Sequence, residues 1–290
     1  MKTYDYVCRK FEEGLCCESY RHTNNSAPDL TDQEIMTIYL FTMQHQKIFK
    51  QKDIHRYAKD HLGSWFPKLN SYQAFNNRLN RLCGAMAKFA QDLIDEFRPS
   101  DCSNGQSLLD SMPIILCSGK RQGKVATEIT DKGYCSTKGM YYYGAKLHAL
   151  GFRRIGKLPY PEHIVVSKAS ENDLTVFKDN WSGLPNRTFF GDKIYQNEDF
   201  FKAMYLNCNS EMLTPVKYPK GVPQAIKKFN KAADELYSKA VSTVRQPIEG
   251  LFSWLIEKSD IQNASKVRST KGLNIHLFGR LAAAFITLIF

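Results

Sequence analysis

The chain has 290 residues, 43% of them hydrophobic and 24% charged, which excludes a disordered or collagen-like protein and predicts a sizeable core. Its 40 Lys and Arg residues outnumber 29 Asp and Glu residues, and the net charge of +11 favours a nucleic acid as partner over a merely solvated basic surface. The eight cysteines have no regular spacing and residues 1–10 have no signal-peptide pattern, so we expect a reduced, cytoplasmic protein.

Helical patterns fill the first hundred residues. Thr31 and Glu34 have the spacing of a capping box, and the apolar periodicity after them predicts a helix from about Asp32 to Gln46. A second helix is expected to end before Gly63. We therefore expect an all-helical domain over residues 1–100.

A third helix in this region, capped by Ser71, carries Arg78 and Arg81 away from its apolar stripe. A compact helical unit with a basic helix is typical of a helix-turn-helix DNA-binding domain. Most three-helix units with surface arginines bind no DNA, however, and the sequence alone favours neither interpretation. Arg78 and Arg81 are thus candidate DNA contacts.

The pattern changes after a polar linker at residues 98–107. Three predicted strands are followed by a helix, a strand, a helix and a strand, which predicts an α/β domain with a mixed sheet over residues 101–290. In chain order these elements cover residues 107–117, 140–150, 162–169, 171–181, 186–190, 197–208 and 210–215.

A basic stretch at residues 216–232 then interrupts the α/β pattern, and we expect it to be a loop or a short insertion. A helix from about Asp234 to about Glu257 should follow, with an apolar stripe through Ile248, Leu251, Phe252 and Leu255. The last ten residues, 281–290, are apolar but too few to span a bilayer, so they predict a core helix and no membrane segment. The lysines of the basic stretch are Lys217, Lys220, Lys227, Lys228 and Lys231.

One acid lies inside the first predicted strand and another ends a later strand. Asp110 interrupts an apolar run, where an ionised carboxylate is costly unless it is paired or bound to a metal. Asp192 follows the strand at residues 186–190, and the two carboxylates converge if the two strands are neighbours. Glu249 lies on the polar side of the long helix, from which it would reach the same edge. These acids form a candidate Asp, Asp, Glu set.

An oxygen-only set of this kind suits Mg²⁺ or Mn²⁺. Two such ions, about 3.5–4 Å apart, can activate an attacking hydroxyl and stabilise the leaving oxygen of a phosphodiester. Arg245, four residues before Glu249, would hold that carboxylate, contact a DNA phosphate, or form only a surface ion pair. Four other acids of the domain are explained as simply by loops or helix caps: Glu128, Asp131, Glu171 and Asp173.

The segments "LLDSMPI", "YYYGAKLHAL", "FFGDKIY" and "RQPIEGLFSWL", in this order, resemble the DDE transposases of bacterial insertion sequences, in particular the insertion sequence 982 family. The N-terminal "LTDQEIMTIYL" and "SYQAFNNRLNRL" resemble that family too. The resemblance implies a ribonuclease-H-like catalytic core behind a helical DNA-binding region. It also implies that Asp110, Asp192 and Glu249 are the catalytic triad and hold two Mg²⁺ ions, with Mn²⁺ as a substitute.

The chain departs from the broader insertion-sequence signature at Ser242 and Ile256, where a tyrosine and a lysine are expected. Lys258 lies one helical step from the lysine position, and Arg245 matches the signature. His148, in "KLHAL", is either a residue supporting the catalytic acids, a DNA contact, or an ordinary histidine satisfied on a sheet face. The candidate DNA contacts are Arg78, Arg81, Lys146, Lys193, Lys227, Lys228 and Arg245.

The resemblance implies a DNA transposase that cleaves the ends of its own element and joins the resulting 3′-hydroxyl to target DNA. Its partners would be terminal inverted repeats and target DNA, bound by a homodimer in a synaptic complex, and it would be associated with the nucleoid. Two alternatives stay open: a catalytically inactive, transposase-derived DNA-binding protein, and a metal-dependent nuclease of the same fold.

Overall fold

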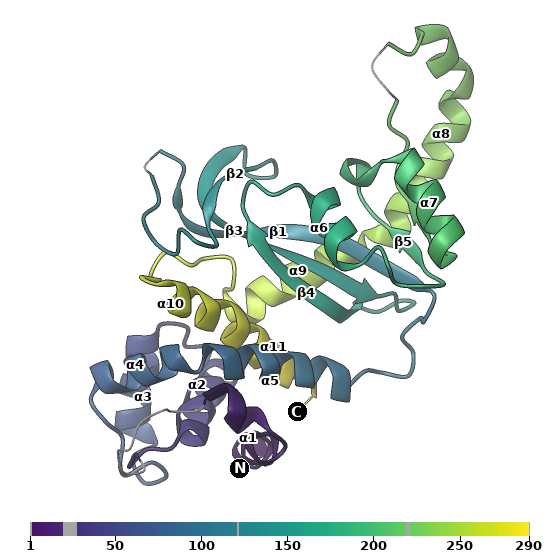
Figure 1. The fold of residues 1–290 in the computed structure, drawn as a ribbon. Helices are drawn as coiled ribbons and strands as arrows, with labels where there is room; N and C mark the ends of the chain where they lie inside the picture. Colours follow the sequence, from purple (N-terminus) through teal and green to yellow (C-terminus); the bar gives the residue numbers. More distant parts are fainter. Residues whose placement is uncertain (1, 20–27, 121, 219–220, 290) are drawn as a thin grey trace.

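The computed structural model describes residues 2–19, 28–120, 122–218 and 221–289. After residue 100 the described chain forms a mixed sheet with helices on both faces, as the sequence predicts (Figure 1). The strand order is β2-β3-β1-β5-β6. The sixth strand, β4, pairs with β3 and lies off this path. The strands are β1 (Gln106–Ser118), β2 (Asp131–Cys135), β3 (Met140–Phe152), β4 (Tyr160–Lys168), β5 (Thr188–Phe190) and β6 (Glu211–Leu213).

Strand β1 lies between an antiparallel neighbour, β3, and a parallel neighbour, β5. Successive residues of a strand point to opposite faces of the sheet. Leu108 accordingly packs into the core shared with α8 (Gln224–Arg245) and α9 (Pro247–Ser259). Leu109 packs on the other side, with Phe177 of α6 (Asp173–Asn180) and Met204 of α7 (Glu198–Cys208).

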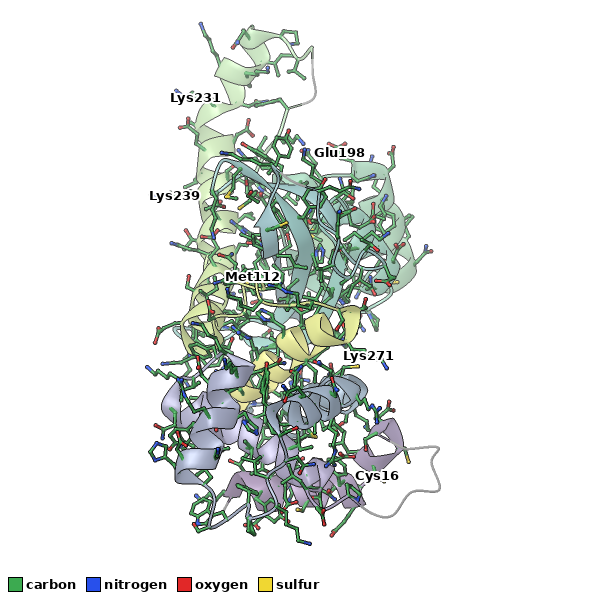
Figure 2. All side chains as sticks on the ribbon, turned by 90° about the vertical axis from the view of Figure 1, so that its left-hand side faces the viewer. Cys16, Met112, Glu198, Lys231, Lys239 and Lys271 are labelled. Carbon is green, nitrogen blue, oxygen red and sulfur yellow. The ribbon has the colours of Figure 1, made fainter. Side chains whose placement is uncertain are left out.

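The basic stretch is more helical than the sequence predicts. Helix α8 begins at Gln224, ten residues before the expected start. Pro223 directly precedes it and is compatible with this start, because proline is tolerated at the beginning of a helix. The expected single helix is also divided, since Pro247 has no N–H to continue the ladder and opens α9 instead. Figure 2 shows Lys231 and Lys239 along α8, which extends beyond the sheet, whereas Lys220 lies outside the described residues.

The predicted N-terminal helices are confirmed. Thr31 and Glu34 form the expected capping box at the start of α2, and Ser71 accepts a hydrogen bond from the Ala74 N–H to cap α4. The helices of this half are α1 (Lys2–Glu12), α2 (Asp32–Gln46), α3 (Gln51–His61), α4 (Tyr72–Arg81) and α5 (Cys83–Glu96), with a 3₁₀ turn η1 (Leu15–Ser19) after α1.

The end of the chain, which the sequence analysis places in the second domain, packs against this helical half. Helix α10 (Thr270–Asn274), the π-helical turn η3 (Ile275–Gly279) and α11 (Arg280–Ile289) lie among the N-terminal helices, and α11 packs against α2 and α5 (Figure 1). One apolar core therefore runs through both halves. Thr270–Ile289 is long and apolar enough to cross a membrane, but 72% of its most apolar window is buried within the protein, as in a core helix.

Candidate active site

Asp110 lies within β1, and Asp192 lies just beyond the end of the neighbouring parallel strand β5. Leu108 of β1 is paired with Phe190 of β5, and each aspartate lies two residues further along its strand direction. Residues two apart in a strand share a face, so Asp110 lies on the same face as Leu108. This face is the one that α8 and α9 cover. Asp192 lies beyond the end of β5, and its negative charge acts on Arg245.

The turn after β5 depends on a glycine. Gly191 donates its N–H to the Leu213 carbonyl oxygen at 3.0 Å, which ends the parallel pairing with β6. A Cβ at this position would lie 2.9 Å from the Tyr195 ring and 3.1 Å from the Met212 sulfur. The small residue lets the chain turn tightly into the short helix η2 (Lys193–Tyr195), and Asp192 is left exposed at its start.

Arg245 joins the acid of the strand to the acid of the helix. One of its guanidinium nitrogens lies 2.7 Å from Asp110 Oδ2, and the other lies 2.6 Å from Glu249 Oε1. Arg245 ends α8 and Glu249 lies in the first turn of α9, so the junction at Pro247 sets their relation. The Asp110 side chain is 23% exposed and that of Glu249 is 55% exposed. The site is therefore open to solvent on the helix side.

The negative charges of three carboxylates act on the Arg245 guanidinium. Burial raises the pKa of Asp110 to about 6, although Arg245 and the Ser111 N–H oppose the rise. Burial lowers the pKa of Arg245, but the negative charges of Asp110, Glu249 and Asp192 outweigh it and raise that pKa above its ordinary value. Asp110 is thus a carboxylate whose surroundings favour a nearby cation.

Tyr195 is a site residue that the sequence analysis missed. It is 1% exposed, and among the described residues its hydroxyl has no hydrogen-bond partner. Burial raises its pKa well above the ordinary value, and the charges of Asp173, Asp110 and Asp192 raise it further. The phenol therefore stays neutral, and it packs with Leu109 and Phe177 on the side of the sheet that α6 and α7 cover. Its position as the last residue of "FFGDKIY" was the available signal.

The opposite face of β1 carries a separate polar network. Asp173 accepts hydrogen bonds from Ser111 at 3.1 Å and from Lys146 at 3.0 Å, and it is 9% exposed. His148 lies 2.8 Å from the Ser167 hydroxyl, and burial lowers its pKa to about 4, so it is neutral at pH 7. Of the interpretations left open for His148, the structure favours the ordinary buried histidine. Lys146 is occupied by Asp173, which argues against its expected role as a DNA contact.

Arg78 is not a surface residue, contrary to the sequence prediction. It is 8% exposed, donates to the Leu30 carbonyl oxygen and pairs with Asp32 at 2.6 Å. These bonds tie α4 to the start of α2, because a buried guanidinium must be paired. It is thereby unavailable to DNA in this structure.

The other candidate contacts differ in accessibility. Arg81, Lys193 and Lys228 are exposed, and the partly buried Lys227 lies 5.7 Å from the centre of the Tyr218 ring. Lys258 pairs with Glu257 at 3.0 Å.

The donor set suits a hard divalent cation, since Asp110, Asp192 and Glu249 offer only carboxylate oxygens. In this structure, however, no group of three His, Cys, Asp or Glu side chains among the described residues is arranged to hold a metal ion. Arg245 takes the position between Asp110 and Glu249 that a cation would share. The residues fit Mg²⁺ in their chemistry, and binding requires the guanidinium to move away from Asp110.

Comparison with known proteins adds no family to this description. A scan against protein-family models finds no match, and a search of curated proteins finds no match either.

Proposed function

We propose that this chain is a DNA transposase of the DDE type, with a ribonuclease-H-like catalytic core. The observation that carries the proposal is that Asp110 lies in β1 and Asp192 comes just after the neighbouring parallel strand β5, with Glu249 linked to Asp110 through Arg245. The sheet order and its mixture of parallel and antiparallel pairs are compatible with this fold. The motif resemblance and the net charge of +11 point the same way.

The two aspartates would hold Mg²⁺ or Mn²⁺ from the strands, and Glu249 would add a ligand from α9. The bound ions would activate the attacking oxygen and stabilise the leaving oxygen of a phosphodiester. Arg245, once separated from Asp110, has a planar pair of donors suited to a phosphate. The reaction begins with water attacking the DNA at the element end, and the freed 3′-hydroxyl then attacks target DNA.

The exposed lysines and arginines would supply contacts to phosphates, with affinity that falls as salt rises. Among the candidate contacts Arg81, Lys193 and Lys228 are the accessible ones. A homodimer holding two terminal inverted repeats is what the family resemblance implies for the complete reaction.

The test uses DNA that carries the inverted repeats flanking the coding sequence in its source. With Mg²⁺ the wild type should nick this DNA at the element ends and join the ends to a second DNA molecule. Asp110→Asn, Asp192→Asn and Glu249→Gln should each reduce both products to background. Glu257→Gln is the matched control, because Glu257 is an exposed acid at the far end of α9.

Three outcomes of this assay would contradict the proposal. Nicking without joining would identify a nuclease of the same fold. Specific binding of the ends without any metal-dependent cutting would identify an inactive DNA-binding protein. Cleavage that survives all three acid substitutions would place the chemistry elsewhere in the molecule.

A further inference from the structure

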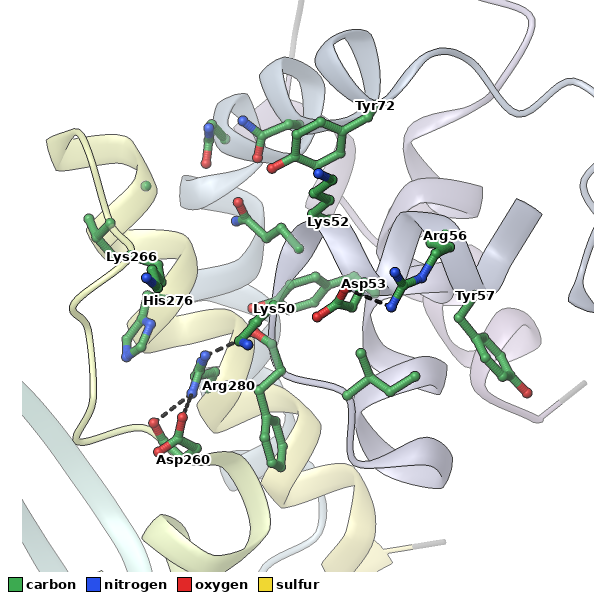
Figure 3. Close-up of a pocket in the computed structure, with 18 of the residues that line it drawn as sticks. Lys50, Lys52, Asp53, Arg56, Tyr57, Tyr72, Asp260, Lys266, His276 and Arg280 are labelled. Carbon is green, nitrogen blue, oxygen red and sulfur yellow. Dashed lines mark hydrogen bonds and ion pairs between the residues drawn. The ribbon is translucent and has the colours of Figure 1, made fainter. Parts of the chain in front are cut away.

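A second site lies where the helical half meets the chain that follows α9. A cavity of about 950 Å³ opens there between α3, α4 and the segment from Asp260 to Arg280 (Figure 3). We call it the junction groove. The described residues that line it include seven Lys and Arg but only three Asp, so the groove is basic. Neither the acids of the candidate active site nor Arg245 lines it.

The basic residues of the junction groove are only partly neutralised. Arg56 pairs with Asp53 at 3.0 Å and Arg280 pairs with Asp260 at 3.3 Å. Lys50, Lys52 and Lys266 form no ion pair with any residue that the structure describes. Each is exposed, so its ammonium group can reach an anion in the groove. A groove with surplus ammonium groups favours a phosphate backbone.

One face of α4 supplies the remaining recognition groups. Tyr72, Asn76 and Asn80 follow one another at intervals of four residues, so they share a helix face, and all three line the groove. The side-chain oxygens of Asn76 and Asn80 are buried and have no hydrogen-bond partner among the described residues. A buried acceptor without a partner is costly, which indicates that a donor from a ligand belongs there.

The groove is fixed relative to the acids. Helix α9 has Glu249 in its first turn and is followed by Asp260, which lines the groove, so about 16 Å of helix separates the two. The next segment is hydrogen-bonded to β1, with Ile115 N–H to Gln262 O at 2.8 Å and Ala264 N–H to Ile115 O at 2.9 Å.

We propose that the junction groove binds an unpaired strand of DNA that continues from the cleavage site. Lys50, Lys52 and Lys266 contact its phosphates, Tyr72 stacks on a base, and Asn76 and Asn80 accept hydrogen bonds from the amino groups of bases. Buried amide oxygens cannot reach base edges inside an intact duplex, whereas a base removed from its stack can enter. The inference rests on the proposed function, because that function makes DNA the substrate.

The test measures binding of the full chain to a fluorescein-labelled single-stranded oligonucleotide by fluorescence anisotropy, with EDTA present to prevent cleavage. A blunt duplex of the same sequence is measured in parallel. The double variant Asn76→Ala, Asn80→Ala should bind the single strand at least tenfold more weakly and the duplex within twofold of wild type. Asn77→Ala is the control, since Asn77 is an exposed residue of the same helix outside the groove.

Two further variants separate the contributions. Lys50→Gln with Lys52→Gln should weaken binding of the single strand and reduce its salt dependence by about two phosphate contacts. Tyr72→Ala should abolish the fluorescence change of 2-aminopurine placed within the strand, because that change reports stacking. Thermal unfolding followed by circular dichroism verifies that each variant is folded.

Equal binding of the single strand by wild type and the double asparagine variant would overturn the inference, as would equal losses on single strand and duplex. These results are independent of catalysis. If the protein joins DNA with metal but the groove variants bind the single strand as wild type does, the proposed function stands and the proposed role of the junction groove is refuted. If the groove variants bind the single strand more weakly but the protein cuts no DNA, the role of the junction groove stands and the proposed function is refuted.

Discussion

Arg245 is the residue through which the acids of the candidate site are connected. The two ends of its guanidinium pair with Asp110 and Glu249 at once, so the partly buried Asp110 does not lie unpaired. The same arrangement competes with a divalent ion for the same oxygens. Arg245 therefore stabilises the protein without metal, and under the proposed function it would have to move away from Asp110 for an ion to bind.

Replacing Arg245 by Met should expose this competition. The free energy of unfolding at pH 7 should fall by about 1–3 kcal/mol, since Asp110 loses its partner while it remains mostly buried. Excess Mg²⁺ should raise the unfolding midpoint of the variant more than that of wild type. Arg154→Met, which breaks a pair with Asp101 away from the site, should show no such added Mg²⁺ effect.

His148 predicts a pH dependence of stability. Its pKa is lowered to about 4, first by burial and then by Lys146, although Asp173 opposes this. An unfolded chain binds the proton near pH 6.5, whereas the folded chain binds it near pH 4. Stability from this group is therefore complete above pH 6.5 and falls as the pH drops from 6.5 to 4, by on the order of 3 kcal/mol.

Urea unfolding at a series of pH values measures this effect. His148→Gln should flatten the loss between pH 6.5 and pH 4 relative to wild type, whatever its stability at pH 7. His45→Gln, on the exposed surface of α2, should retain the wild-type slope. Parallel curves for wild type and His148→Gln would show that the histidine is not held neutral in the folded state.

The residues of the candidate site were predictable to different degrees. Asp110 and Asp192 were found from sequence because a charge within or at the end of an apolar strand stands out. The ion pairs of Arg78 and Lys146 were not predicted, because helix and strand periodicity give the face of a residue but not its partner. Asp32 and Asp173, which form ion pairs with Arg78 and Lys146, come from segments distant in sequence.

At the scale of elements, β1 and β3 form the support of the site. Their antiparallel pairing runs nearly the full length of both strands and holds β1 in register with β5. Gly144 permits the close approach, since a Cβ there would overlap the carbonyl oxygen of Ile114. The strands cannot move apart without displacing Asp110, which lies four residues before Ile114 on the same face.

Gly144→Ala should consequently lower the free energy of unfolding by about 3 kcal/mol. Gly183→Ala is the matched control, because nothing lies within 4 Å of the added methyl group and the change should be close to neutral. Equilibrium denaturation of both variants makes the comparison. Equal stability of the two would contradict the tight pairing of β1 and β3 described here.

Elements were predicted best where a local signal marked their ends. The capping box of Thr31 and Glu34 fixed the start of α2, and Ser71 fixed that of α4. The prediction was wrong at the start of α8, because the basic stretch at residues 216–232 was expected to be a loop, whereas the helix begins at Gln224. Strand neighbours depend on contacts between distant segments, so the sequence required an assumption that β1 and β5 adjoin.

At the scale of the whole molecule, the two ends of the chain share one core. The buried face of α11, including Leu281, Phe285 and Ile286, packs among the N-terminal helices. Arg280 reinforces the junction by donating to the backbone oxygens of Ser259 and Phe49, which belong to different halves. The sequence could not indicate this return, since an apolar C-terminal helix packs equally well on a sheet.

A fragment of residues 1–100 should therefore not fold as an independent domain. It would expose the apolar surface that α11 covers, and we expect strong binding of the dye ANS and no cooperative thermal transition. The full chain, measured under the same conditions, should unfold cooperatively. A fragment that unfolds as sharply as the full chain would show that the division expected at residue 100 is a true domain boundary.

Anomalous diffraction from crystals grown with Mn²⁺ and DNA tests the central claim most directly. The account predicts Mn²⁺ peaks among the carboxylates of Asp110, Asp192 and Glu249, with Arg245 turned away from Asp110. The contradicting result is a structure saturated with Mn²⁺ and bound to DNA in which these carboxylates hold no ion and Arg245 still bridges Asp110 and Glu249.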